Sequence, residues 1–276
     1  MLLKKSWLIL ITMLLLGAML LMGCAAPAEE PAAEPEAEEQ AVEEHQPATI
    51  LIAAAASLEN AYVESLIPMF EQQYDWITVE GTYDSSGKLQ TQIEEGLAAD
   101  IFMSAALKQM NALVEGGFVE QAAVIELLEN KIVLIEPAAA PSGIDSFEQA
   151  ADAAIIAIGD PESVPAGQYA QEAFTSLGIW EQVLAKASLG TNVTEVLNWV
   201  AEGSADIGVV YATDAASNDG VTVIAEAPAG ALAAPVIYPV ALLADAPQAE
   251  AAQLFIDFLQ SDEAAAVFTE YGFTVN

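Results

Sequence analysis

Short apolar runs that alternate with helical patterns fill most of this 276-residue chain and constrain its fold more than any other feature. In the helical patterns apolar residues recur every three or four positions, as at Val193, Val196 and Val200. Pro68 lies inside the first such pattern and is expected to kink or shorten that helix. Strands that alternate with helices predict an α/β fold with largely parallel sheets. We expect strands near 49–53, 77–81, 100–104, 131–136, 155–158, 188–189, 207–210 and 236–243, and helices near 58–70, 89–95, 107–115, 166–177, 193–200, 248–259 and 262–271.

The first 24 residues have the pattern of an export signal. Lys4 and Lys5 precede an apolar stretch of 17 residues, 7–23, which is followed by Cys24. The Leu-x-Gly-Cys ending resembles a bacterial lipoprotein signal, so we expect residues 1–24 to be a signal peptide in which Cys24 is lipidated. The protein would then be extracytoplasmic and anchored to the cell membrane. An uncleaved anchor helix is the alternative, although the stretch is shorter than the roughly 20 residues that span a bilayer.

A tether is expected to follow the signal. Residues 25–47 are mainly Ala, Pro and Glu, and eight of these 23 residues are Glu. Because such a composition cannot bury a hydrophobic core, we expect a disordered chain that repels itself. The prolines in this segment argue against a helix. The folded part is therefore expected to run from 48 to 276.

The folded part is strongly acidic. Of the 41 acidic residues in the chain, eight glutamates lie in the tether, which leaves 33 against four lysines, a net charge of −29. The chain has no arginine. Nucleic-acid binding is excluded, because it requires a basic surface.

The scarcity of histidine and cysteine excludes further chemistry. The only histidine, His45, lies in the tether, so the folded part cannot form a Ser-His-Asp site. Cys24 is the only cysteine, so transition metals lack their usual nitrogen and sulfur ligands there, and no cofactor is expected. Residues 85–88 match the S-x-x-K start of penicillin-recognising enzymes, although the companion K-T-G and S-D-N elements are missing. An acyl enzyme therefore stays an alternative.

Hydrogen-bond donors gather in five loops that follow strands, which is where open α/β sheets bind ligands. In the most informative loop, within 159–170, Pro165 suits the first position of a helix and leaves the amides of Ala166 and Gly167 free to meet an anion. Another loop opens a helix with a predicted capping box from Asn192 to Glu195. The loops offer hydroxyls and amides but no fixed positive charge. They contain Ser57, Ser85, Ser86, residues 164–167, Asn192, Val193 and Tyr211.

Six motifs in a fixed order carry a family resemblance. They are A-A-A-S-L at 54–58, Y-D-S-S-G-K-L at 83–89, A-D-I-F-M-S-A at 99–105, residues 159–170, residues 208–215 and Y-G-F at 271–273. This ordered set resembles the molybdate-binding proteins of bacterial molybdate ABC importers and covers essentially all of 48–276. No one motif is decisive by itself.

The resemblance implies a fold and a role. The fold would be α/β and like that of type II periplasmic binding proteins: two lobes that close on a tetrahedral oxyanion, with two chain crossovers. Residues 48–131 plus 239–276 would form one lobe, and 132–238 the other. The protein would be a monomer that is not an enzyme, and it would pass molybdate or tungstate to an ABC permease and its ATPase. The implied ligand contacts, with no direct bond to the metal atom, are Ser57, Ser86, Ala166, Val193 and Tyr211.

The chemistry of the ligand fits this donor set. Molybdate and tungstate are fully deprotonated at neutral pH and bring only acceptors, so neutral donors can satisfy them. Sulfate has the same charge and shape but is smaller, so selection must rest on cavity size. Asp84 departs from the serine run that relatives often have, and we expect its carboxylate to point to solvent. A receptor for another oxyanion such as sulfate, or for an organic acid, and a non-catalytic surface adhesion lipoprotein are the remaining alternatives.

Overall fold

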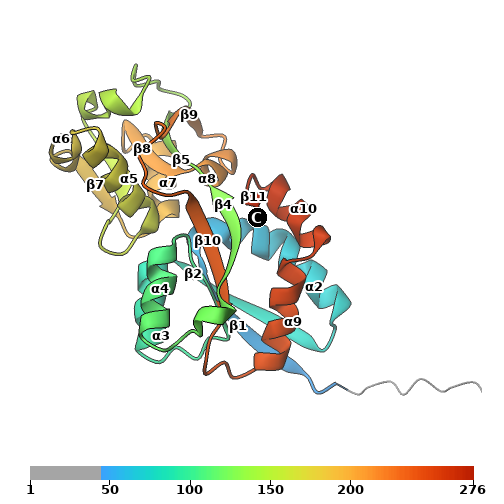
Figure 1. Cartoon of the computed structure of the whole chain (residues 1–276). Helices are drawn as coiled ribbons and strands as arrows, with labels where there is room; N and C mark the ends of the chain where they lie inside the picture. Colours follow the sequence, from blue (N-terminus) through green and yellow to red (C-terminus); the bar gives the residue numbers. More distant parts are fainter. Residues whose placement is uncertain (1–44) are drawn as a thin grey trace, which may run out of the picture. The chain divides into compact units, whose positions relative to one another are not determined.

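Two sheets with helices packed around them make up the part of the chain that the computed structural model describes, residues 45–276 (Figure 1). The predicted signal peptide, Cys24 and the predicted tether as far as Glu44 lie outside the described residues. Residues 45–47 belong to no helix or strand, and the His45 ring stacks on Trp76 with 4.5 Å between ring centroids. Among the described residues no helix is both long enough and apolar enough to cross a membrane.

The first sheet has the strand order β11-β4-β10-β3-β1-β2. In it β1 is parallel to β2 and β3, whereas β10 is antiparallel to β3 and β4, and β11 is antiparallel to β4. We call this sheet and its helices the first lobe. Its strands are β1 (Ala48–Ala55), β2 (Ile77–Asp84), β3 (Ile101–Met103), β4 (Ile125–Asn130), β10 (Val236–Leu242) and β11 (Thr274–Val275).

The second sheet has the strand order β7-β6-β8-β5-β9. In it β6 is parallel to β7 and β8, and β5 is antiparallel to β8 and β9. This sheet and its helices form the second lobe. Its strands are β5 (Ile132–Pro137), β6 (Ile156–Gly159), β7 (Ala187–Gly190), β8 (Ile207–Tyr211) and β9 (Val221–Glu226).

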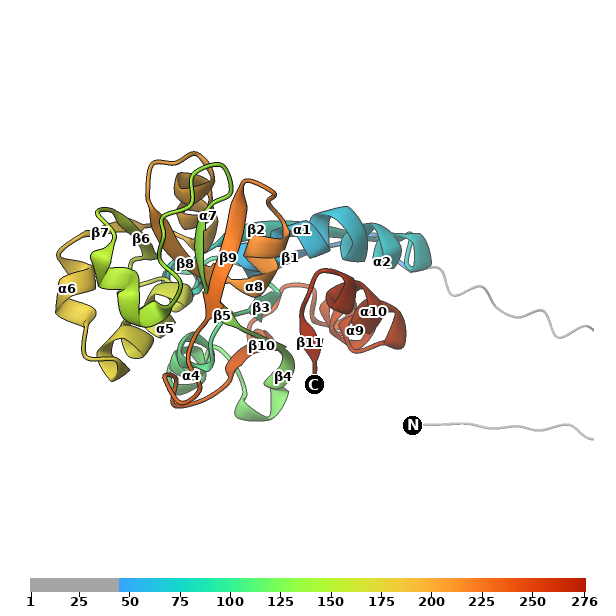
Figure 2. The ribbon, with the colours of Figure 1, turned by 90° about the horizontal axis from the view of Figure 1, so that it is seen from above.

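The chain passes between the two sheets twice, once at Lys131, between β4 and β5, and once through residues 227–235, between β9 and β10 (Figures 1 and 2). The predicted fold class, two α/β lobes with two crossovers, is confirmed. The expectation of largely parallel sheets is wrong, since both sheets are mixed. The reason lies in the crossovers: β5 and β10 enter their sheets from the other lobe, so they run opposite to strands whose carboxyl ends face that lobe.

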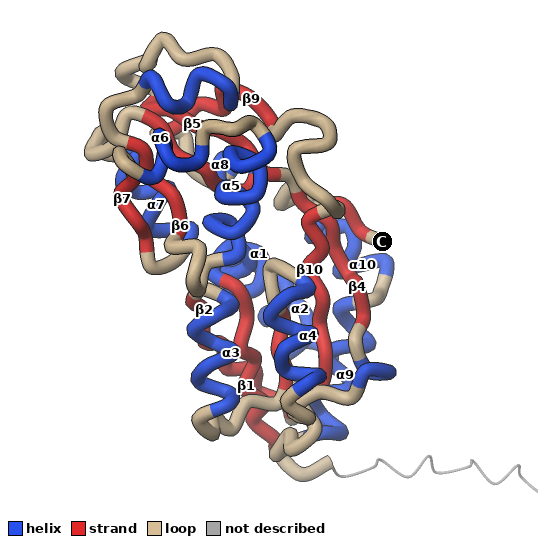
Figure 3. Tube along the Cα trace, turned by 60° about the vertical axis from the view of Figure 1, so that its left-hand side comes forward, coloured by secondary structure: helices blue, strands red, loops and turns tan. Residues whose placement is uncertain are grey.

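Helices cover both faces of the first sheet, and α3 lies beside α4 on one of them (Figure 3). Ala53 of β1 packs with this pair, whereas Ile50 and Ile52 belong to the cluster on the opposite face, because neighbouring strand residues point to opposite sides. The helices are α1 (Glu59–Ala61), α2 (Ile67–Gln73), α3 (Ser86–Glu94), α4 (Leu107–Glu115), α5 (Pro165–Ser176), α6 (Trp180–Leu184), α7 (Val193–Ala201), α8 (Ala212–Ala216), α9 (Ala249–Leu259) and α10 (Asp262–Glu270), with 3₁₀ turns at Ala56–Leu58, Gln121–Ala123 and Phe147–Asp152.

Three local predictions can be compared with the structure. Pro68 does not shorten its helix: the chain stays helical through α1, a π-helical turn at Tyr62–Leu66 and α2, and Pro68 is the second residue after the π-helical turn. Pro165 begins α5, as predicted. The Asn192 side chain caps α7 by accepting the Glu195 amide at 2.9 Å, but Glu195 Oε2 accepts from the amide of Thr191 rather than from that of Asn192.

Candidate functional site

The carboxyl ends of the parallel strands in both lobes lead to one small pocket. β1 and β2 are neighbours in the first sheet, and β7, β6 and β8 are consecutive in the second, so the loops that follow them come together. The structure thus places all five predicted contact residues around the same pocket. It is lined by Ala55, Ala56, Ser57, Asp84, Ser85, Ser86, Ala105, Val164, Pro165, Ala166, Val193 and Tyr211.

The first lobe presents serine hydroxyls to this pocket. Ser57 follows β1, is half-buried, and its Oγ lies 2.9 Å from the hydroxyl of Tyr238. Ser86, the first residue of α3, is fully buried, and its Oγ accepts the amide of Ala105 at 3.0 Å. Because a hydroxyl has one proton and two acceptor positions, Ser86 is held by this bond and can still donate.

The second lobe presents the N-termini of α5 and α7. The first amides of a helix have no partner inside it and carry the positive end of the helix dipole. At α5 the N-cap residue is Val164, whose side chain makes no hydrogen bond to the helix amides. The amide of Ala166 therefore has no capping side chain as a partner. An added Cβ at Gly167 would overlap the carbonyl oxygen of Gly159, so α5 can approach β6 this closely only with glycine there. At α7 the Asn192 side chain accepts the amide of Glu195, two residues beyond Val193, so it does not cover the amide of Val193.

Tyr211 closes the pocket from the end of β8. Its side chain is buried, its hydroxyl donates to the carbonyl oxygen of Ala105 across the lobes at 3.5 Å, and its ring meets Tyr238 edge to face. Burial, and then the nearby Tyr238, raises the pKa of Tyr211 well above the usual value for a tyrosine. The phenol therefore keeps its proton at neutral pH and serves as a donor.

A buried carboxyl group lies behind Tyr211. Asp214, 6% exposed, accepts the backbone amide of Tyr211 through Oδ2 at 3.0 Å. Burial raises the pKa of Asp214 to about 7, and the bond from the Tyr211 amide opposes this rise. Hence only part of the Asp214 population carries a negative charge at neutral pH.

Asp84 does not simply point to solvent, so that expectation is wrong. Its side chain is 27% exposed, and Oδ1 accepts the Ser85 amide at 2.7 Å, Lys88 Nζ at 3.1 Å and Asn192 Nδ2 at 3.4 Å. The lysine, one turn along α3, offsets the carboxylate charge at the pocket. Asn192 belongs to the second lobe, so Asp84 also links the lobes. The sequence signal was the i, i+4 spacing of Asp84 and Lys88, which predicts such an ion pair on a helix.

Other hydrogen bonds join the lobes beside the pocket. The amide of Gly87 donates to the carbonyl of Ser163 at 2.9 Å, and Gln109 Nε2 donates to Gln168 Oε1 at 3.2 Å. An added Cβ at Gly87 would overlap that Ser163 carbonyl oxygen. Gly87, Ser163 and Gln168 lie within the ordered motifs of the sequence, but no local pattern shows that they meet across the lobes, so sequence reasoning missed these contacts.

The chain is similar to solute-binding proteins over nearly all of its described residues. The family model for bacterial extracellular solute-binding proteins matches residues 50–274. This chain belongs to that family. The molybdate-binding protein ModA of Escherichia coli is 35% identical over 82% of this chain and 89% of its own length. YvgL of Bacillus subtilis, named as a candidate ABC transporter substrate-binding lipoprotein, is 40% identical over 84% of this chain and 88% of its own.

Solved structures of solute-binding proteins share the fold. The periplasmic molybdate-binding protein of Azotobacter vinelandii has a TM-score of 0.71 with 22% identity, over 82% of this chain and 99% of its own. The sulfate-binding protein SubI of Mycobacterium tuberculosis has a TM-score of 0.72 with 17% identity, over 83% and 86%. At these identities the likeness establishes two lobes of this type and leaves the ligand open.

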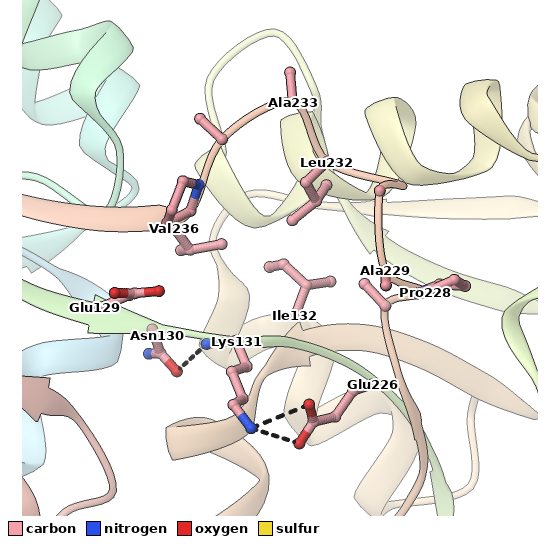
Figure 4. Close-up of a pocket in the computed structure, with 14 residues that line it drawn as sticks. Glu129, Asn130, Lys131, Ile132, Glu226, Pro228, Ala229, Leu232, Ala233 and Val236 are labelled. Carbon is pink, nitrogen blue, oxygen red and sulfur yellow. Dashed lines mark hydrogen bonds and ion pairs between the residues drawn. The ribbon is translucent and has the colours of Figure 1, made fainter.

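A larger pocket of this solute-binding protein lies at the two crossovers and contains none of the five predicted contacts (Figure 4). The crossover pocket measures about 840 Å³ and the smaller pocket about 200 Å³, both including the space at their openings, so size alone would not select the smaller one. The lining of the crossover pocket, however, includes an exposed ion pair between Lys131 and Glu226 at 2.9 Å and no helix N-terminus. The smaller pocket has the convergent donors, so it is the candidate site.

Gly87→Ala should keep the lobes from closing fully. The new methyl group would overlap the Ser163 carbonyl, which is backbone and cannot move aside without shifting the start of α5. We expect a larger radius of gyration by small-angle X-ray scattering than for the unsubstituted protein. Gln92→Ala, on the exposed side of the same helix, is the control and should leave the radius unchanged. Equal radii for all three proteins would contradict the inferred contact.

Asp214→Asn should change the pH dependence of stability. Burial raises the folded-state pKa of Asp214 from 3.8 to about 7. The protonated carboxyl therefore makes its full contribution to the free energy of unfolding below pH 3.8, and this contribution is lost as the pH rises to about 7. Asparagine keeps an oxygen for the Tyr211 amide but does not titrate. Between pH 4 and pH 7 the unsubstituted protein should lose up to roughly 4 kcal/mol of unfolding free energy relative to the variant. Urea unfolding at several pH values measures this difference, and a constant difference would refute the buried, titrating carboxyl.

Proposed function

We propose that this protein captures molybdate or tungstate between its lobes and delivers it to an ABC permease and its ATPase. One observation carries the proposal: five segments that carry the proposed donors, each at or just after the end of a different strand, converge on one pocket whose lining has no basic side chain. The proposed ligand contacts are Ser57, Ser86, Ala166, Val193 and Tyr211.

The donor chemistry supports an oxyanion that carries no proton. A fully deprotonated dianion offers only acceptors, and each donor around the pocket can bond to it without a proton transfer. A protonated phosphate would require an acceptor for its own proton. The carboxylate beside the pocket, Asp84, already accepts from the Ser85 amide, Lys88 and Asn192, which favours the deprotonated ligands.

The relatives point to the same ligand. ModA proteins of Escherichia coli and Haemophilus influenzae are each 35% identical to this chain over 82% of its length and are named for molybdate binding. Selection against sulfate would then rest on the size of the space between the donors, because the two oxyanions share charge and shape.

The S-x-x-K alternative has little geometric support. Lys88 Nζ bonds to both carboxylate oxygens of Asp84, at 3.1 and 3.4 Å, and the hydroxyl of Ser85 makes no hydrogen bond within the described part of the chain. A lysine occupied by a carboxylate cannot act as the base that activates the serine. The chain's relatives are solute-binding proteins, which agrees with a binding role.

Lipid anchoring is the second part of the proposal. The Leu-x-Gly-Cys ending and the likeness to YvgL both support a lipidated Cys24 on the outer side of the cytoplasmic membrane. Capture and delivery would then occur at the membrane surface, with the Ala-, Pro- and Glu-rich segment as the spacer.

Titration calorimetry with molybdate, tungstate, sulfate and phosphate tests the ligand. We expect heat of binding with the first two and much weaker binding of sulfate and phosphate. Tight sulfate binding would identify a receptor for that oxyanion instead. The absence of heat with all four ligands, for protein shown to be folded by circular dichroism, would contradict the proposal and favour the adhesion alternative.

Ser86→Ala and Tyr211→Phe test the site. Each should weaken molybdate binding by roughly 1–3 kcal/mol, because each removes a hydrogen bond to a charged ligand. Ser65→Ala and Tyr271→Phe are matched controls, since these two hydroxyls bond to each other at 3.3 Å and do not line the pocket. If both test variants bound molybdate as the controls do, the site would be misplaced.

Mass spectrometry of the membrane-extracted protein tests the anchor. The N-terminal peptide should begin at Cys24 and carry a lipid mass, whereas Cys24→Ala should lack the lipid and retain residues 1–23. Retention of residues 1–23 in the unsubstituted protein would identify the uncleaved anchor helix.

A further inference from the structure

Ser85, the residue before α3, has a hydroxyl that the protein itself does not use. The side chain is 3% exposed, and its Oγ has no hydrogen-bond partner among the described residues. Ser85 also lines the candidate oxyanion pocket. A buried hydroxyl without a partner is unfavourable, because it gives up its bonds to water and gains nothing in return.

The helix does not account for this serine. A serine at the N-cap position usually accepts an amide from the second or third residue of the helix. Ser85 makes no such bond, although it occupies that position with an extended backbone. Its hydroxyl therefore stabilises neither the helix end nor a neighbouring loop.

The backbone of Ser85 is nonetheless held firmly. Its amide donates to Asp84 Oδ1 at 2.7 Å, and its carbonyl accepts the amide of Leu89 at 3.1 Å. Asp84 is itself fixed by Lys88 and by Asn192 from the second lobe. A side chain on so constrained a backbone loses little further entropy when a ligand binds, so its hydrogen bond is well preorganised.

We propose that Ser85 donates its hydroxyl proton to the bound oxyanion, as a contact beyond the five assigned to Ser57, Ser86, Ala166, Val193 and Tyr211. This inference rests on the proposed oxyanion function. It gives α3 two adjacent hydroxyls at the ligand. They differ in one respect: Ser86 is also fixed by the Ala105 amide, whereas Ser85 is free for the ligand.

Ser85→Ala tests the proposal by two measurements on the full-length protein. In calorimetry, molybdate should bind about ten- to a hundredfold more weakly than to the unsubstituted protein. In thermal unfolding without ligand, the variant should be as stable as the unsubstituted protein or more stable, because no internal bond is lost. Ser85→Cys keeps nearly the same size with a weaker donor and should bind with intermediate affinity.

Ser65→Ala is the matched control, for which we expect a change in stability and none in molybdate affinity. Its hydroxyl contacts Tyr271 outside the pocket, so molybdate affinity should be unchanged and ligand-free stability slightly lower. If the unsubstituted protein binds molybdate and Ser85→Ala binds it equally well, the role of Ser85 is refuted while the proposed function stands. If Ser85→Ala loses ligand-free stability, the residue is structural and the proposal also fails. If the unsubstituted protein binds none of the oxyanions, the proposed function itself fails.

Discussion

The structure depends on one constraint: the carboxyl ends of the parallel strands in both sheets must face each other. Loops and helix N-termini follow those ends, so this orientation alone brings Ser57 and Ser86 opposite Ala166 and Val193. The two crossovers impose it, because β5 and β10 enter their sheets from the opposite lobe and fix the direction of each sheet. If one sheet were reversed, its donors would lie on the far side of the molecule.

An acidic protein can hold a dianion here because the donors are neutral and the carboxyl groups beside them carry little net charge. Asp84 is the one carboxylate in the pocket lining, and Asp214 accepts the backbone amide of Tyr211. Asp84 is paired with Lys88 at 3.1 Å, and burial raises the pKa of Asp214 to about 7. The remaining acidic residues act mainly through solvent, where salt screens them beyond about 8 Å. Local hydrogen bonds can therefore outweigh the long-range repulsion that a net charge of −29 predicts.

Much of the local structure followed from pattern and composition. Helix α4 has the predicted bounds, Pro165 begins α5, and Asn192 caps α7, because each depends on residues within one turn. Strands β4 and β9 were missed. Both mix apolar with acidic or polar residues and are partly exposed, with Val223 45% exposed, so neither shows the continuous apolar run of a buried strand or the strict alternation of a half-buried one. The position of Asp84 was predicted wrongly, since its partner Asn192 is 108 residues away.

The sequence by itself determined the kinds of donor that the loops carry, the absence of cysteine and of any histidine other than His45 from residues 45–276, and the starts of the helices that aim their amides at the pocket. These properties depend on residue type and on neighbours a few positions apart. Only the tertiary structure decided which donors meet, that Asp84 also bonds to Asn192 of the second lobe, and that Ser85 is buried with its hydroxyl unused. Those outcomes depend on contacts between lobes and on strand direction, which are settled when distant segments pack together and lie beyond any local pattern.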